Sequence, residues 1–172
     1  MVRLTIERVI VKNYRRLRAT DIKLQPDLNI IVGDNESGKS TLLEAINLAL
    51  KGQINRRPAL YELHPYLFNQ GCVDQFVGEL KRGGRAEPPE ILIELYMAEH
   101  PDLAYLRGSN NSLRESRLGI SLRIHLDDEH FKEEYSNYIR RPDDLRSIPI
   151  EYYIHSQGRR QEQGAIRHTR YP

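Results

Sequence analysis

The residues from Gly33 to Thr41 form a complete GxxxxGK[ST] phosphate-binding loop, and no other pattern in the 172-residue chain is as specific. A loop that wraps a polyphosphate must aim several backbone N–H groups inward, and its glycines permit turns that a Cβ would block. In such loops the lysine, here Lys39, reaches the β- and γ-phosphates, and the next hydroxyl, here on Ser40, is offered to Mg²⁺. The motif therefore predicts a binding site for a nucleoside triphosphate.

The sequence on either side of the loop gives the motif the context that it requires. Residues 41–50 are rich in helix formers with apolar residues at helical spacing, which predicts a helix whose N-terminus faces the phosphates. Residues 28–32 are a short apolar, β-branched run, which predicts a buried strand that ends at the loop. Two further apolar stretches, within 4–11 and 22–24, predict two earlier strands. Small kinases and simple GTPases usually place the phosphate loop after the first strand, so this order disfavours them.

We expect nucleotide contacts from the whole loop. Its residues are Gly33, Asp34, Asn35, Glu36, Ser37, Gly38, Lys39, Ser40 and Thr41. Lys39 is the predicted catalytic cation and Ser40 the predicted Mg²⁺ ligand.

The loop and the sequence segments around it resemble a known family. The resemblance rests on three segments, which are Val11-Lys12-Asn13-Tyr14-Arg15-Arg16-Leu17, Asn29-Ile30-Ile31-Val32-Gly33 and, from the loop into the helix, Gly33 through Ile46. They resemble the N-terminal ATPase segment of the OLD-family (overcoming lysogenization defect) nucleases, which are close kin of RecF and of SMC-type repair ATPases. Glu36 points to the OLD branch, because the RecF and SMC branches more often have glycine at this position. The resemblance covers residues 1–50.

That resemblance implies an α/β fold of the P-loop NTPase class. It implies the first lobe of an ABC-type ATPase head, with a mixed sheet, antiparallel strands ahead of the loop, and helices. It also implies ATP and Mg²⁺ as cofactors, DNA as a partner of the full-length protein or complex, and a homodimer with ATP between two heads.

Three residues outside the loop also receive expected roles. The resemblance implies that Arg15 approaches the nucleotide, although a solvated arginine at a strand end is the alternative. Tyr14 is expected to pack in the β-layer. Residues 150–154 can form the strand that leads to the glutamine loop of the resembled ATPases, and the resemblance then implies that Gln157 contacts Mg²⁺ and water at the nucleotide site.

Several parts that such an ATPase needs are missing from the chain. No apolar strand ends in an Asp-Glu pair, no serine-glycine signature is present, and a Toprim nuclease domain is absent. We therefore expect the first part of a larger protein, with weak or no ATP hydrolysis by this chain alone.

The remaining sequence predicts one lobe over residues 1–154 and a basic, flexible tail over 155–172. An irregular insert occupies about 52–90, and apolar residues from Val73 to Leu80 in it have near-helical spacing. Residues 91–97 and 118–126 predict strands. Asp127 or Asp128 can cap a helix that runs to residue 139, and this capping role is favoured over a metal site in the segment 125–130.

Composition limits the classes of protein to which the chain can belong. The net charge of +2 gives no general polyanion-binding field, although the tail concentrates four arginines against one glutamate. A single cysteine, Cys72, excludes an intramolecular disulfide. No apolar run is long enough for a signal peptide or a membrane span, which favours the cytoplasm.

Three functions stay open at this point. The first is the ATP-binding part of an OLD/RecF-like DNA-processing enzyme. The second is an ATP-binding regulatory or truncated product without turnover, and the third is a stand-alone kinase or GTPase.

Overall fold

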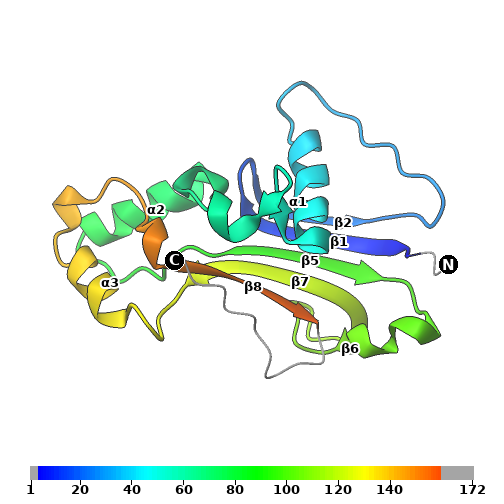
Figure 1. Ribbon diagram of the computed structural model, residues 1–172. Helices are drawn as coiled ribbons and strands as arrows, with labels where there is room; N and C mark the ends of the chain where they lie inside the picture. The colour runs from blue at the N-terminus through cyan, green and yellow to red at the C-terminus, as the bar shows by residue number, and fades with distance from the viewer. Residues whose placement is uncertain (1–3, 160–172) are drawn as a thin grey trace.

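A computed structural model describes residues 4–159 of the chain (Figure 1). The strands are β1 Ile6–Tyr14, β2 Leu17–Lys23, β3 Gln53–Ile54, β4 Arg57–Pro58, β5 Ile91–Met97, β6 Arg107–Gly108, β7 Arg117–Leu126 and β8 Tyr153–Arg159. The α-helices are α1 Lys39–Lys51, α2 Gln70–Lys81 and α3 Lys132–Ile139. Short 3₁₀ turns are η1 Ala59–Glu62, η2 Pro65–Leu67, η3 Pro101–Leu106, η4 Pro142–Asp144 and η5 Ile150–Tyr152.

The main sheet has the strand order β2-β1-β5-β7-β6, and β8 also pairs with β7. Every strand pairing in the described part of the chain is antiparallel. The register aligns Val11 with Ile93 and Ile93 with Leu122, and all three side chains are fully buried. This apolar row shows that one face of the sheet is the core face, as the period-2 pattern of the strands requires. The predicted α/β class, with antiparallel strands ahead of the loop, is confirmed.

Helix α1 covers the core face of the sheet and stands above β1 and β5 in Figure 1. Its buried residues are Leu42, Ala45, Leu48 and Ala49, which is the 3–4 spacing of one helical face. Full burial of a leucine contributes about 1.5–3 kcal/mol. Gly52 ends the helix in the left-handed conformation at φ 64°, and its N–H donates to Leu48 O. This packing fixes the start of α1, and with it the phosphate loop, relative to the sheet.

The opposite face of the sheet carries a buried carboxylate. Glu94 on β5 is 2% exposed and accepts hydrogen bonds from the Tyr96 hydroxyl at 3.0 Å and from the Ser112 N–H at 2.9 Å. The Ser112 hydroxyl donates to it as well, at 2.5 Å. Buried charges need such partners. Glu94 therefore ties the loop before β7 to β5, a strand that is buried along its whole length.

The predicted strand over residues 28–32 is wrong. In the structure this segment has no regular secondary structure, and Leu28, Ile30 and Val32 are 72%, 76% and 82% exposed. The Asn29 side chain bonds both the N–H and the carbonyl of Gln25 at 2.8 Å, which stabilises a local turn instead. A buried strand needs neighbours for its backbone groups, and none of the described strands lies in register beside this segment. Figure 1 shows it as an arch between β2 and α1.

The other predicted elements agree more closely. Helix α2 matches the spacing of Val73 to Leu80, and β5 and β7 match the two predicted strands. Asp127 accepts from the His130 N–H at 3.1 Å and caps a turn, but α3 begins only at residue 132, after Phe131, and has no side-chain cap. The predicted capping of this helix by Asp127 or Asp128 is therefore wrong. Tyr14 is fully buried in the sheet layer as expected, and burial raises the pKa of its hydroxyl to about 12.

The predicted boundary at residue 154 is corrected by β8. His155 to Arg159 pair with Ile124 to Ile120 of β7, so the sheet includes five residues that were assigned to the tail. Backbone pairing with β7 stabilises these residues despite their polar composition. Residues 150–152 form η5 rather than a strand. The rest of the predicted tail, 160–172, lies outside the described residues.

Candidate nucleotide-binding site

The two glycines of the phosphate loop stand where a side chain would not fit. Gly38 has φ 95°, and a Cβ there would lie 2.9 Å from Leu17 Cδ2. A Cβ on Gly33 would lie 2.6 Å from Ser37 Oγ. Glu36, between them, also has a positive φ of 75°. Gly38 is therefore favoured both by its backbone conformation and by its contact with Leu17, whereas a Cβ on Gly33 would require the Ser37 side chain to move.

Lys39 is folded back onto its own loop. Its Nζ donates to Gly33 O at 2.5 Å and to Asp34 O at 2.7 Å, and it lies 3.5 Å from Ser37 Oγ. These carbonyl oxygens keep the ammonium beside the loop. Because a phosphate carries full negative charge, its oxygens are stronger acceptors for the ammonium than these carbonyls.

The N-terminus of α1 presents free donors next to this lysine. The first backbone bond of the helix is Leu42 N–H to Gly38 O at 2.9 Å, so the N–H groups of Lys39, Ser40 and Thr41 have no partner within residues 4–159. No acidic residue occupies the first turn, and no side chain caps it. Free N–H groups at the positive end of a helix attract an anion.

The side chains of the loop are open to a ligand. Ser40 is exposed, as are Asp34, Asn35, Glu36 and Ser37. Asn35 lies in a turn, and the loop-shaping role that the family resemblance implies for it stays a prediction. These residues fit a triphosphate with Mg²⁺, because the glycines leave room, the amides donate, and Ser40 offers a hydroxyl.

The hairpin between β1 and β2 brings two arginines to the loop. Arg15 has φ 48°, its N–H donates to Leu67 O at 2.7 Å, and its guanidinium donates to Glu44 Oε1 on α1 at 3.0 Å. Arg16 donates to both the carbonyl and the carboxylate of Glu36 at 3.2 Å. The hairpin turn is thus attached both to α1 and to the phosphate loop.

A hollow of about 310 Å³ opens between this hairpin and α1. It is lined by Arg15, Arg16, Thr41, Tyr66, Phe68 and Gln70. Thr41 belongs to the loop motif, so the hollow adjoins the predicted phosphate position. Burial and the nearby charge of Arg15 lower the pKa of His64, whose ring lies 6.1 Å from that of Tyr66. The structure thus adds Tyr66, Phe68 and Gln70 to the site, and sequence spacing gave no signal for them.

Comparison with known proteins agrees with this geometry. The model of the AAA ATPase domain family matches residues 5–146, which is most of the chain. The chain belongs to the AAA ATPase domain family. RecF, the DNA replication and repair protein, of Haemophilus ducreyi is 54% identical over 41 residues, which are 24% of this chain and 11% of that protein.

Two further relatives extend the likeness. RecF of Actinobacillus pleuropneumoniae is 36% identical over 69 residues, which are 37% of this chain and 19% of that protein. The DNA double-strand break repair Rad50 ATPase of Methanopyrus kandleri is 49% identical over 45 residues, which are 26% of this chain and 5% of that protein. The expected relationship to RecF/SMC-type ATPases is confirmed. The matched segments span less than a fifth of each relative.

The structure places Gln157 of this ATPase domain away from the loop. Its Nε2 donates to Ala49 O at 2.6 Å, near the C-terminal end of α1. Ten residues separate Ala49 from Lys39, which is about 15 Å along a helix. Gln157 lies within β8, opposite Leu122, and not in a loop after a strand. In this structure it joins β8 to α1, and its predicted contact with the nucleotide stays a prediction.

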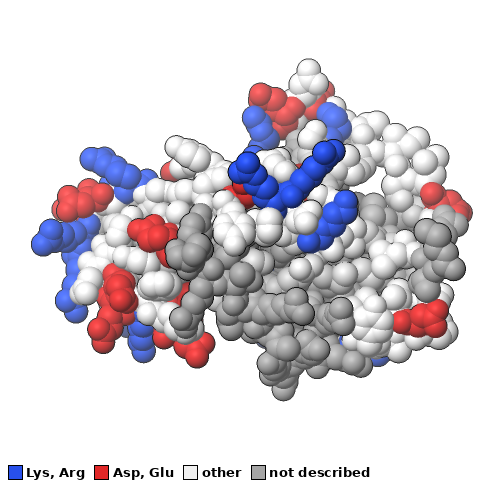
Figure 2. All heavy atoms as spheres, viewed as in Figure 1, with Lys and Arg blue, Asp and Glu red and all other residues white. Residues whose placement is uncertain are grey.

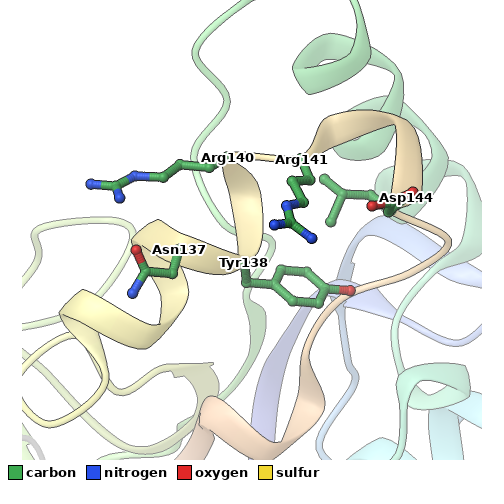
Figure 3. Close-up of a pocket in the computed structure, with 6 residues that line it drawn as sticks. Asn137, Tyr138, Arg140, Arg141 and Asp144 are labelled. Atoms are coloured by element: carbon green, nitrogen blue, oxygen red, sulfur yellow. The ribbon is translucent and has the colours of Figure 1, made fainter.

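A second hollow of the domain, of about 530 Å³, lies at the far end of the molecule. Asn137, Tyr138, Arg140, Arg141, Asp144 and Leu145 line it. Figure 3 shows Arg140 and Arg141 pointing to different sides. Acidic and basic side chains alternate over this end, where α2 and α3 lie (Figure 2). The mixed charge makes this end a solvated surface rather than a phosphate-binding patch.

Residues 4–159 hold no group of three His, Cys, Asp or Glu side chains arranged to bind a metal. In the segment 125–130, Asp127 accepts from the His130 ring at 2.8 Å in addition to its capping bond. None of the helices in the described range is long and apolar enough to cross a membrane.

Proposed function

We propose that this chain binds Mg²⁺-ATP at Gly33–Thr41 as the N-terminal, ATP-binding part of a RecF-like ATPase that acts in DNA processing. The observation that carries the proposal is the group of three free N–H groups at the start of α1, directly beside the Lys39 ammonium. A helix N-terminus with an adjacent cation matches the charge of the β- and γ-phosphates.

Each side chain of the loop has a role in this proposal. Lys39 exchanges the carbonyls of Gly33 and Asp34 for phosphate oxygens, and Ser40 offers its hydroxyl to Mg²⁺. The bound ion neutralises charge on the phosphates. Arg15 adds a second cation on the hollow side of α1. The family match and the glycine geometry support this assignment.

We further propose that the chain alone hydrolyses ATP poorly. Hydrolysis requires a group that positions the attacking water and a carboxylate near Mg²⁺. The buried carboxylates among residues 4–159 are Glu94 and Asp127. Glu94 is engaged by Tyr96 and Ser112, and Asp127 by His130. The acidic half of the site would then come from further sequence of a larger protein or from a second head in an ATP-bound homodimer.

The proposal also includes DNA as a partner of the larger protein and membership of the OLD branch. The names of the relatives support DNA repair or replication as the setting. Glu36 supports the OLD branch, and its carboxylate bonds Arg16 in the structure. Cleavage of supercoiled plasmid by the full-length protein with Mg²⁺ tests the nuclease part, and DNA binding without cleavage would contradict it.

Calorimetric titration with Mg²⁺-ATP tests nucleotide binding by the 172-residue chain. We expect Lys39→Ala to weaken binding at least tenfold, because it removes the charge that faces the phosphates. Lys51→Ala is the matched control, since Lys51 lies in the last turn of the same helix and should leave the affinity within about twofold. Equal losses in both variants, or no binding by the unchanged chain, would refute the proposal.

A further inference from the structure

The hollow beside the phosphate loop is lined by a largely exposed aromatic side chain, Tyr66, whose ring lies 6.1 Å from that of His64. Tyr66 is 78% exposed, whereas Phe68, two residues later, is 2% exposed. Both line the same hollow. Phe68 belongs to the core and stacks edge-on with Tyr153 at 5.3 Å. The apolar floor is thus fixed, while the Tyr66 ring is free to contact a ligand.

The position of this hollow suits the part of a nucleotide that the phosphate loop leaves outside. Thr41 joins the loop motif to the hollow, and Arg15 and Arg16 line its other side. The volume of about 310 Å³ is at the lower end for small-ligand sites. An aromatic face next to guanidinium groups is the combination that holds a nucleobase by stacking and its phosphates by charge.

We propose that Tyr66 stacks on the base of the nucleotide whose phosphates bind at Gly33–Thr41. This inference rests on the proposed function and deepens it, since it assigns the base to the hollow between the β1–β2 hairpin and α1. Tyr66 contacts the ring face, which every base has, so the contact adds affinity for ATP and for GTP alike. The η2 turn, Pro65–Leu67, carries Tyr66 and is attached to the hairpin through the Arg15 N–H bond to Leu67 O at 2.7 Å.

Calorimetric titrations with two probes, Mg²⁺-ATP and Mg²⁺-tripolyphosphate, test the inference. The second probe has the phosphates but no base. We expect Tyr66→Ala to weaken ATP binding about tenfold, as loss of one base–aromatic stack does, and to leave tripolyphosphate binding within about twofold. Tyr66→Phe keeps the ring and should keep ATP binding within about threefold.

The matched control is Tyr61→Ala. Tyr61 lies in η1, is 54% exposed and is not among the residues that line the hollow, so this change should affect neither probe. Because both tyrosines are exposed, neither variant should unfold, which far-UV circular dichroism checks.

Three outcomes would overturn the inference. Tyr66→Ala could leave ATP affinity unchanged, or it could weaken tripolyphosphate as much as ATP. If Lys39→Ala alters neither probe, the proposed phosphate site fails as well. That last result is distinct from a failure of Tyr66 alone, in which Lys39→Ala still weakens both probes.

Discussion

At the scale of single residues, the phosphate loop depends on backbone shapes that side chains disfavour. Gly38 combines φ 95° with a Cβ position 2.9 Å from Leu17 Cδ2, whereas Gly83 has φ 76° with nothing within 4 Å of its Cβ position. Comparing substitutions at these two glycines therefore distinguishes the free-energy cost of the backbone conformation from that of steric crowding.

We predict that Gly83→Ala lowers the free energy of unfolding by about 1 kcal/mol, the cost of a left-handed residue. Gly38→Ala should cost about 1 kcal/mol more, because the Leu17 methyl must also move. Urea denaturation of both variants measures the difference. Equal losses would show that Leu17 does not confine the loop in solution.

The candidate site residues that belong to the motif are visible in the sequence, whereas the other residues beside the loop are visible only in the structure. Gly33 to Thr41 could be found because the spacing of two glycines and a lysine reflects the geometry of phosphate binding. Tyr66 could not be found, because it reaches the hollow through the contact between Leu67 and Arg15, more than fifty residues apart in the chain. Gln157 was predicted from the resemblance of a short segment alone, and in the structure its side chain donates to the Ala49 carbonyl.

At the scale of elements, the distribution of apolar residues predicted the elements that pack into the core. Helices α1 and α2 and strand β7 have apolar residues at the spacing of their conformation, and β5 is a short, nearly continuous apolar run that is buried along its whole length. The pattern failed for residues 28–32, since an apolar β-branched run shows that a segment can form a strand but not that a neighbour is available. It also missed the length of β8, whose polar residues are held by pairing with β7.

The loop before β7 gives a prediction at this scale. Glu94→Ala removes the acceptor of both Ser112 donors and one of the acceptors of the Tyr96 hydroxyl, which keeps Asn111 Oδ1 at 3.3 Å. We therefore expect the free energy of unfolding to fall by about 2 kcal/mol. Amide hydrogen exchange at Ser112 should become faster. Glu87→Ala, an exposed control in the segment before β5, should change stability by less than about 0.5 kcal/mol. Unchanged exchange at Ser112 would contradict the anchoring role of Glu94.

At the scale of the whole molecule, the arch between β2 and α1 leaves apolar side chains uncovered. Leu28, Ile30 and Val32 are all more than 70% exposed, and such patches favour association. In the structure, the sheet and α1 do not depend on them.

We therefore predict that the double change Ile30→Ser and Val32→Ser alters the free energy of unfolding by less than about 0.5 kcal/mol and reduces self-association. Leu48→Ala is the comparison, because Leu48 is fully buried and its truncation should cost about 2–5 kcal/mol. Denaturation and analytical ultracentrifugation measure the two effects. A loss of several kcal/mol in the double variant would show that residues 28–32 form a core strand in solution.

The central claim is that phosphates bind at the start of α1, and backbone amide NMR of the chain titrated with Mg²⁺-ATP tests it most directly. We predict that the N–H signals of Lys39, Ser40 and Thr41 shift on titration, because these groups have no partner within residues 4–159 and lie at the positive end of the helix. The same shifts should be absent in Lys39→Ala at equal ATP concentration. Unmoved signals at these three residues, or shifts confined to Arg140 and Arg141 at the far hollow, would contradict the account.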